Sequence, residues 1–311
     1  MKRTARPARC ISPPAIDVLR VLVLGARGML ARDVIATAPS QVELVARDSA
    51  ALDVTDPAAV HAAIDEIAPH VVINCAAYTN VDGAESDRER AFAVNGHAPG
   101  YVARAVAHRS DTVLIHYGTD YVFDGTASRP YREEDPCAPA GVYGASKLAG
   151  EQRIAEHKVR ALILRTQWLY GVHGRSFPRT MWERATAGLA TKVVNDQTGR
   201  LTYTVDLARA TWCLIALERQ GRGVSAPRGR ILHIANTGQG TWYEVARHVF
   251  ERLGKPELVT PCTTADYPRP AKRPAWSVLD TSRFDAFVDR PLPGWKGALD
   301  RFLDQVGTAG S

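Results

Sequence analysis

The sequence predicts an α/β protein built on a doubly wound parallel sheet, with a smaller C-terminal portion. Two observations carry this prediction. Short apolar runs alternate with segments of helical spacing through the first half of the 311 residues, as in parallel strands joined by helices. The first apolar run ends in Gly25-Ala26-Arg27-Gly28, a tight turn that opens a helix and is typical of a Rossmann-type fold.

The elements of the first half follow from local pattern. Asp56-Pro57 begins a helix well, because Asp caps a helix and Pro fits its first turn. Apolar runs predict strands at 21–24, 42–45, 71–73, 113–115 and 161–164. Helical spacing predicts helices after Gly28, after Asp56, and over 89–95, 99–107 and 146–157.

The pattern changes after Trp168, where Gly and Pro break the chain into loops and short segments. Beyond that point we expect helices at 205–217, 243–253 and 295–306, a strand at 231–234 and a loop at 256–274. The predicted domains are a disordered leader at 1–17, a nucleotide-binding domain at 18–170 plus about 204–236, and a substrate-binding portion at 171–203 and 237–311.

The net charge of +6 does not indicate a nucleic-acid partner. Lys2, Arg3, Arg6 and Arg9 lie in a leader without acids, and without them the chain has 35 basic and 33 acidic residues. Such a balance lacks the basic stripe that tracks a phosphate backbone. We expect no nucleic acid as partner.

Composition also indicates the class of protein and its compartment. Hydrophobic residues make up 45% of the chain, enough to fold, and nowhere do eighteen apolar residues follow one another. The five cysteines are scattered and odd in number, which suits a reducing compartment. We therefore expect a cytoplasmic protein without a membrane partner.

The turn at Gly25 and Gly28 predicts a dinucleotide site, because glycine lets the backbone approach a pyrophosphate at a helix N-terminus. The residue at the end of the second strand selects the nicotinamide cofactor. Arg47 stands there, and with Arg27 it favours NADPH; NADH stays open, since Arg47 on a solvated surface would select nothing.

Tyr143 and Lys147 form a YxxxK pair, whose i,i+4 spacing places phenol and ammonium on one helix face. A free tyrosine is a poor acid at neutral pH, and we expect Lys147 to lower the pKa of Tyr143. Thr119 follows the strand at 113–115, at the sheet edge where ligands bind. It could donate a hydrogen bond to a carbonyl oxygen that Tyr143 protonates.

Together these residues resemble the extended short-chain dehydrogenase/reductases, and more narrowly the dTDP-4-dehydrorhamnose reductase family. The similar segments run from about Val21 to Leu303. They are VVINCAAYTNVDGAES (71–86), GTDYVFDG (118–125), VYGASKLAGE (142–151), RTQWLYGVHGRSF (165–177), NDQTGRLTYTVDLA (195–208) and YPRPAKRPAWSVLD (267–280).

The resemblance implies a role for each matching residue. Tyr143 would be the proton donor, with Thr119 and Lys147 completing the catalytic set. Thr119, Asp120 and Trp168 would contact the sugar. The cofactor would be held by Gly28, Met29 and Leu30 at the pyrophosphate, Asp53 and Val54 at the adenine, Ala77, Tyr78 and Thr79 along its length, and Tyr117 and Lys147 at the nicotinamide ribose.

The chain departs from the family pattern in two places. Gly118 stands where the family usually has Ser, which bears on the orientation of the site more than on activity. Some relatives bind Mg²⁺ through acidic residues at a dimer interface, and Asp33 lies where one such acid would be. The sequence does not place the other acids, so no metal ligand is assigned and Mg²⁺ dependence stays open; the chain is expected to be a monomer or a homodimer.

The resemblance implies NADPH-dependent reduction of a dTDP-linked 4-keto-6-deoxy sugar. Three alternatives remain: a 4-ketoreductase for another deoxysugar, a 4,6-dehydratase or epimerase, and a non-catalytic regulatory subunit. Tyr121 after Asp120 speaks against a dehydratase, whose pattern has Glu there, and the complete triad speaks against a binding subunit. Candidates to bind the diphosphate are Arg175, Arg179, Arg200, Arg269, Lys272 and Arg273.

Overall fold

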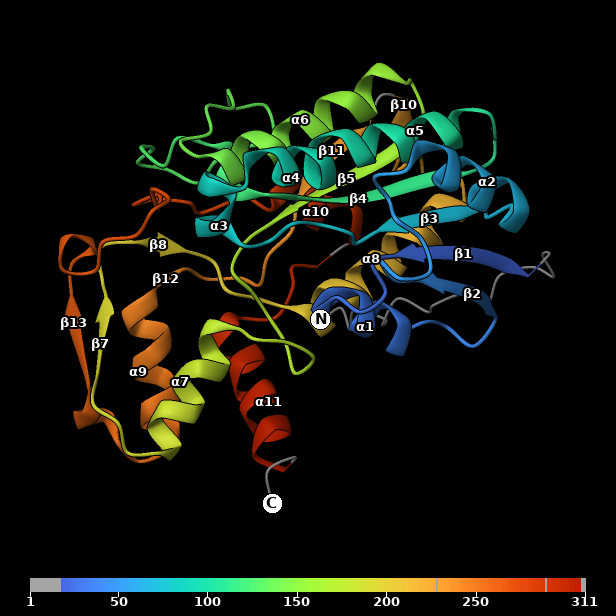
Figure 1. The fold of residues 1–311 in the computed structure, drawn as a ribbon. Helices are drawn as coiled ribbons and strands as arrows, with labels where there is room; N and C mark the ends of the chain where they lie inside the picture. Colours follow the sequence, from blue (N-terminus) through green and yellow to red (C-terminus); the bar gives the residue numbers. More distant parts are fainter. Residues whose placement is uncertain (1–17, 228, 289, 309–311) are drawn as a thin grey trace, which may run out of the picture.

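The computed structural model describes residues 18–227, 229–288 and 290–308, so the predicted leader at 1–17 lies outside the described residues. Six parallel strands form the central sheet in the order β2-β1-β3-β4-β5-β11 (Figure 1). Their bounds are β1 (Leu19–Leu24), β2 (Val42–Arg47), β3 (Val71–Asn74), β4 (Val113–Thr119), β5 (Arg160–Thr166) and β11 (Arg230–His233). The short strand β10 (Ala226–Pro227) pairs antiparallel with the start of β5.

Helices cover both faces of this sheet, as a doubly wound fold requires (Figure 1). One face carries α2 (Pro57–Ile67), α5 (Ala98–Ala107) and α6 (Val142–Glu156). The other carries α1 (Met29–Ala36), α8 (Thr204–Arg219) and α10 (Ser282–Val288). The strands are buried on both sides, which explains their continuous apolar runs.

A second lobe lies below the carboxyl edge of the sheet, with its own apolar core. It contains α7 (Phe177–Thr186), α9 (Trp242–Arg252) and α11 (Trp295–Thr308). Its short strand pairs are β6 (Leu169–Tyr170) with β9 (Thr202–Tyr203), β8 (Thr198–Gly199) with β12 (Gly240–Thr241), and β7 (Thr191–Val194) with β13 (Val259–Cys262).

Several short turns complete the chain. They are α3 (Val81–Ser86), α4 (Arg88–Phe92), the π-helical turn η1 (Ala93–His97), and the 3₁₀ turns η2 (Asp120–Val122), η3 (Pro256–Leu258) and η4 (Thr264–Asp266). No helix in the described part of the chain is long and apolar enough to cross a membrane.

The structure differs from the sequence-based prediction in several elements, including these four. The helix predicted at 89–95 is α4 followed by the π-helical turn η1, and the loop predicted at 256–274 contains β13, which pairs with the distant β7. Helix α7 was hidden because Pro178 looks like a helix breaker, yet it occupies the first turn, where its missing N–H is harmless. Helix α6 begins at Val142, four residues earlier than predicted, so that it includes Tyr143.

Candidate functional site

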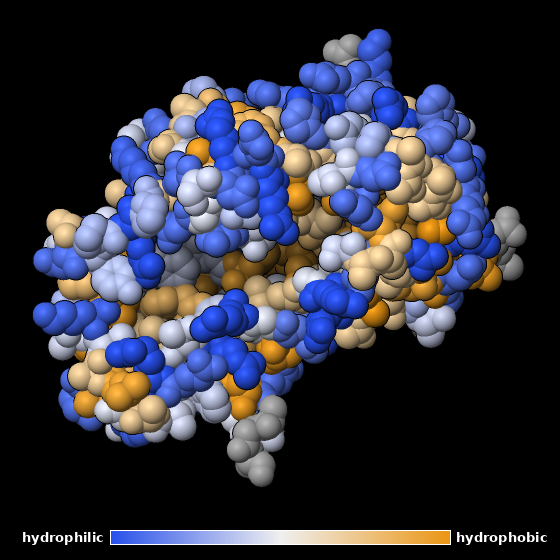
Figure 2. Space-filling model, viewed as in Figure 1, coloured by the Kyte–Doolittle hydropathy of each residue, from blue (hydrophilic) through white to orange (hydrophobic). Residues whose placement is uncertain are grey.

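The candidate site lies where the order of the strands reverses, at the carboxyl ends of β1, β3 and β4. These strands end at Leu24, Asn74 and Thr119. Figure 2 shows a hollow between the sheet half and the second lobe on this side of the molecule. The site therefore draws on both parts of the chain.

The turn after β1 has the form that a pyrophosphate needs. Gly25 adopts φ +74, and a Cβ there would lie 2.7 Å from the backbone N of Ala76, so no other residue fits. The amide of Gly28 donates to the carbonyl of Gly25 at 2.9 Å, and Gly28 caps α1 with no side-chain bond to its first amides. The first N–H groups of α1, from Met29 and Leu30, thus suit an anion.

The adenosine end of this site is built from the end of β2. Arg47 is its last residue, and its carbonyl accepts from the amide of Ala26 at 3.1 Å, which joins β2 to the glycine turn. Arg27 pairs with Asp48 at 2.6 Å. The guanidinium of Arg47 contacts the carbonyl of Ala46 at 3.4 Å. Both arginines stand at the same corner, as expected.

Asp53 and Val54 lie in the turn before α2, next to this corner. The carboxylate of Asp53 accepts from the amide of Thr55 at 2.9 Å and from its hydroxyl at 2.7 Å. These bonds hold the pKa of Asp53 below its ordinary value. The side chain therefore shapes the turn, and its role toward an adenine stays a prediction.

The segment after β3 contains Ala77, Tyr78 and Thr79. It is held by Asn95, a residue that the sequence analysis did not identify. The side chain of Asn95 accepts from the amide of Tyr78 at 2.8 Å and donates to its carbonyl at 2.9 Å. Its amide also donates to Ser146 in α6 at 3.1 Å. Asn95 is fully buried in η1, and π-helical turns often mark functional positions. In the sequence, the one feature that could have indicated Asn95 is that a polar residue ends the helix predicted at 89–95.

Thr119 and Tyr143 meet as the sequence predicts. Thr119 ends β4, and its side chain hydrogen-bonds the phenol of Tyr143 near the start of α6. Tyr121 packs edge-on against the Tyr143 ring, with centroids 5.5 Å apart. Burial raises the pKa of Tyr143 to about 12, against the lowering effect of Thr119. The pKa is therefore raised and not lowered as expected, because burial outweighs the opposing effect of Thr119; the contribution of Lys147 stays a prediction.

Lys147 is buried beneath the end of β4. Its Nζ donates to the carbonyl of Tyr117 at 2.5 Å and lies 3.4 Å from Nε2 of His116. Burial lowers the pKa of Lys147 to about 8. Tyr117 contributes its carbonyl here, while its phenol lies 2.8 Å from the hydroxyl of Thr211 in α8, on the other face of the sheet.

Asp120 is buried beside Thr119, whose hydroxyl donates to it at 3.2 Å. Burial raises the pKa of Asp120 to about 7, against hydrogen bonds from Ser277 and Thr119. The hydroxyl of Ser277 also donates to Gln167 at 3.3 Å. Ser277 and Gln167 were missed in the sequence, because contact between the sheet half and residues far along the chain leaves no local signal.

Trp168 lies where β5 gives way to the second lobe. It adopts φ +48 and stacks on Trp242, with ring centroids 3.7 Å apart. A Cβ on Gly199 would lie 2.6 Å from the Trp168 ring. Trp168 is thus set in an aromatic wall of the second lobe, and its contact with a sugar stays a prediction.

Two of the six basic candidates for a diphosphate lie across from the sheet half. Arg273 pairs with Asp82 of α3 at 2.9 Å, and Arg269 lies 3.9 Å from the same carboxylate. Arg179 pairs with Glu183 at 3.2 Å within α7, and Arg200 donates to Thr281 at 3.2 Å. Arg175 and Lys272 are exposed.

Asp33 is buried in α1 and lies 3.5 Å from His173. In the described part of the chain, no three His, Cys, Asp or Glu side chains come together as metal ligands would. The residues around Asp33 therefore do not make up a metal site on their own.

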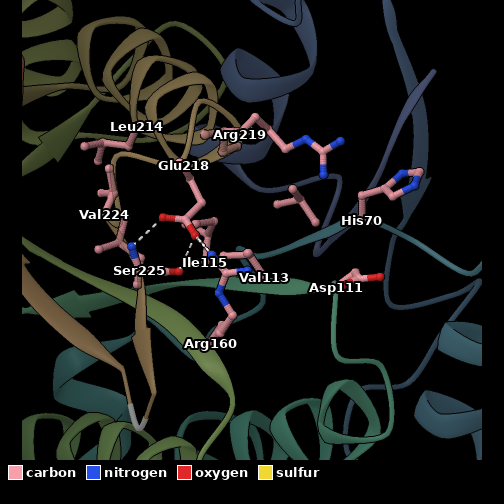
Figure 3. Close-up of a pocket in the computed structure, with 14 residues that line it drawn as sticks. His70, Asp111, Val113, Ile115, Arg160, Leu214, Glu218, Arg219, Val224 and Ser225 are labelled. Atoms are coloured by element: carbon pink, nitrogen blue, oxygen red, sulfur yellow. Dashed lines mark hydrogen bonds and ion pairs between the residues drawn. The ribbon is translucent and has the colours of Figure 1, made fainter. Parts of the chain in front are cut away.

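A cavity of about 240 Å³ lies at the opposite edge of the sheet, between α8 and the beginnings of β3 and β4 (Figure 3). Glu218 stands in it and accepts from the amide and hydroxyl of Ser225, each at 2.7 Å, and it also pairs with Arg160. The strand ends that carry Thr119 lie at the other edge, so this cavity does not belong to the candidate site.

Comparisons with known proteins show the family of the chain. A family model described as "RmlD substrate binding domain" matches residues 19–308. The probable dTDP-4,6-dihydroxy-2-methyloxan-3-one 4-ketoreductase of Streptomyces antibioticus is 44% identical, with 90% of this chain and 93% of that protein covered. The dTDP-4-dehydrorhamnose reductase of Streptomyces griseus is 42% identical, with 94% and 95% covered.

The fold has close counterparts among solved structures as well. The crystal structure of dTDP-4-dehydrorhamnose reductase from Bacillus anthracis in complex with NADP superimposes with a TM-score of 0.84. It is 32% identical and covers 92% of this chain and 99% of its own. Sequence and fold thus indicate the same family: the chain belongs to the RmlD substrate binding domain family, that of the dTDP-4-dehydrorhamnose reductases.

Proposed function

We propose that this chain reduces the 4-keto group of dTDP-4-dehydro-L-rhamnose with NADPH, which gives dTDP-L-rhamnose and NADP⁺. Family membership supports the substrate class, and the NADP complex of the Bacillus anthracis relative supports the cofactor. The observation that carries the proposal is the buried phenol of Tyr143, hydrogen-bonded to Thr119 at the edge of the sheet where ligands bind.

The glycine turn fits the cofactor, because Gly25 leaves room for a close backbone approach and α1 offers free N–H groups. When bound there, the reduced nicotinamide supplies the hydride that adds to carbon 4. Arg47 and Arg27 support a preference for NADPH, since their guanidinium groups match the geometry of a 2′-phosphate.

Tyr143 is the proton donor in this proposal. Its raised pKa keeps the phenol protonated through neutral pH, ready to give its proton to the oxygen on carbon 4 as that oxygen becomes an alkoxide. Thr119 then holds the same oxygen by a hydrogen bond. The phenolate left on Tyr143 is stabilised by the ammonium of Lys147, one helical turn along α6.

The sugar nucleotide is bound by groups of both lobes. Asp120 and Thr119 face the hexulose, and Trp168 provides an apolar wall. Arg273 and Arg269 are the best placed of the six basic candidates, because both lie beside Asp82. Arg273 also lies close to Tyr121, which packs on Tyr143. Asp82 holds these guanidinium groups in place, and guanidinium forks match the geometry of a diphosphate.

A second candidate function is reduction of a different dTDP-4-keto deoxysugar. The Streptomyces antibioticus relative, named for such a reaction, is 44% identical, while the Streptomyces griseus reductase is 42% identical. The two activities share the Thr119–Tyr143–Lys147 chemistry and differ in the shape of the sugar pocket. A panel of dTDP-4-keto sugars, with each product's stereochemistry determined by NMR, distinguishes them.

The proton-donor role is tested with Tyr143→Phe. We expect NADPH oxidation with dTDP-4-dehydro-L-rhamnose to fall by about 10²–10⁴-fold, the usual contribution of a positioned general acid. Tyr101→Phe, in α5 and away from the site, is the matched control and should keep the wild-type rate. A Tyr143→Phe enzyme with most of the wild-type rate would exclude Tyr143 as the proton donor.

A further inference from the structure

A fully buried ion pair lies behind the strand that carries Thr119. Glu151 of α6 and Arg165 of β5 have side chains 3% and 2% exposed. The guanidinium reaches the carboxylate through Nη2 at 2.7 Å and through Nε at 3.1 and 3.2 Å. It also contacts the sulfur of Cys137 at 3.3 Å and lies over the ring of Phe123 at 5.3 Å. Removing two charges from water costs free energy, so we ask which function this buried pair serves.

The end of β4 packs directly against this ion pair. Arg165 is the cross-strand neighbour of Gly118, and Thr166 is that of Thr119. A Cβ on Gly118 would lie 2.8 Å from Cγ of Arg165 and would collide with a carboxylate oxygen of Glu151. This contact gives a physical reason for glycine directly before Thr119.

The same pair reaches Lys147 along α6. Lys147 lies four residues before Glu151, on the same face of the helix. Its surroundings on β4 are the imidazole of His116, whose pKa burial lowers well below its usual value, and the carbonyl of Tyr117. After β3 it faces Cys75, whose thiol stays protonated because burial raises its pKa to about 12. The carboxylate of Glu151, ion-paired with Arg165, favours the ammonium form of Lys147.

We propose that Glu151 and Arg165 act as a positioning pair, in which the carboxylate keeps Lys147 charged and Arg165 locks that carboxylate under Gly118. The pair thereby fixes the register of α6 against β4, and with it the approach of Tyr143 to Thr119. It rests on the proposed function, because Tyr143, Thr119 and Lys147 are the groups that it serves.

The charge of Glu151 shifts the pKa of Lys147 in a definite direction. Burial lowers the pKa of Lys147 to about 8, and the charge of Glu151 opposes that shift. The ammonium is therefore present below about pH 8 and is lost as the pH rises through that value. Removing the carboxylate lowers this pKa further, so the alkaline loss of activity begins at a lower pH.

The test uses Glu151→Gln and the double variant Glu151→Gln/Arg165→Gln. The single variant leaves Arg165 buried and unpaired, and we expect a lower Tm. The double variant removes both charges and should regain most of that stability. In the single variant, the alkaline limb of kcat should move down by about one pH unit or more, as loss of a nearby opposite charge implies. In the double variant the shift should have the same direction and be smaller, because the positive charge of Arg165 is lost as well. Values of KM should change far less than kcat.

A measurement that needs no turnover separates this role from the proposed reaction. Competitive acetylation with acetic anhydride over a pH series, read by mass spectrometry at Lys147, reports the pKa of this amine directly. We expect that pKa to fall in the double variant. Glu156→Gln, near the exposed end of α6, is the matched control and should leave it unchanged.

The outcomes are distinct. A folded double variant with the wild-type acetylation profile and the wild-type pH profile overturns the proposal and leaves the pair as a structural contact only. A lowered Lys147 pKa supports it, even if the wild-type protein fails to reduce the keto sugar, in which case only the proposed function fails.

Discussion

Burial shifts the pKa of three titratable side chains in the candidate site. It raises the pKa of Tyr143 to about 12, lowers that of Lys147 to about 8, and raises that of Asp120 to about 7. A phenol that holds its proton at neutral pH suits a proton donor, as the proposed reduction requires. The sequence pattern placed these groups together, but only the depth of the pocket decides their protonation.

At the cofactor end, one residue is expected to decide between NADPH and NADH. Replacing Arg47 by Ala removes a charged donor to the 2′-phosphate, a kind of bond worth about 1.5–3 kcal/mol. We therefore expect the KM for NADPH to rise by about 10–100-fold, since about 1.4 kcal/mol corresponds to tenfold. The KM for NADH should stay within about twofold, because NADH has no 2′-phosphate.

Steady-state kinetics with both cofactors check this prediction, and Arg104→Ala, on the exposed side of α5, is the control. Comparable efficiency with NADPH and NADH that does not change on substitution of Arg47 would refute the assignment.

Among the elements, the turn from β1 to α1 depends most on one residue. Gly25 and Gly188 both adopt positive φ, at +74 and +68. A Cβ on Gly25 meets the backbone of Ala76 at 2.7 Å, whereas a Cβ on Gly188 meets nothing within 4 Å. An alanine would therefore be strained by its positive φ at both positions, but only at Gly25 would it also collide with neighbouring backbone.

Replacing each glycine by alanine separates these two effects. Gly188→Ala should lower the free energy of unfolding by about 1 kcal/mol, from strain alone. Gly25→Ala should lower it by about 3 kcal/mol or more and abolish NADPH binding, because the turn must move. Urea unfolding and NADPH fluorescence measure both. Equal losses of stability, with NADPH binding retained in Gly25→Ala, would contradict this account of the turn.

The elements that sequence predicts best are those with a local signal. The strands β1, β3 and β5 and the helix capped by Asp56 appear where their apolar runs and caps place them. No local sequence pattern predicts strand β13 or the contacts of Ser277 and Asn95, because their partners lie far along the chain. The proximity of Thr119 and Tyr143 could therefore be predicted, while the groups that hold them in place could not.

At the scale of the whole molecule, two of the polar connections between the lobes differ in burial. Asp206 of α8 accepts a bidentate bond from Arg301 of α11, at 2.6 and 2.9 Å, and a bond from Asn236 at 2.8 Å. Asp82 of α3 accepts from Arg273 at 2.9 Å and from the amide of Ala271 at 3.2 Å. Asp206 is buried, and Asp82 is partly exposed.

This difference predicts separate effects on stability and on substrate binding. Asp206→Ala leaves Asn236 and Arg301 without their shared acceptor, so the free energy of unfolding should fall by about 3 kcal/mol. Asp82→Ala breaks a partly exposed contact and should cost less than about 1 kcal/mol. It frees the segment that carries Arg269 and Arg273, so the KM for the dTDP-sugar should rise by about tenfold, while that for NADPH stays within about twofold.

Thermal unfolding and steady-state kinetics on the two variants measure these effects side by side. Each variant is the control for the other, because both remove one aspartate from the interface of the lobes. If Asp82→Ala raised both KM values equally, the segment would be a general support of the fold rather than part of the sugar-nucleotide site. A selective change in the sugar KM would place residues 269–273 at the diphosphate, because only that ligand engages the second lobe in the proposed reaction.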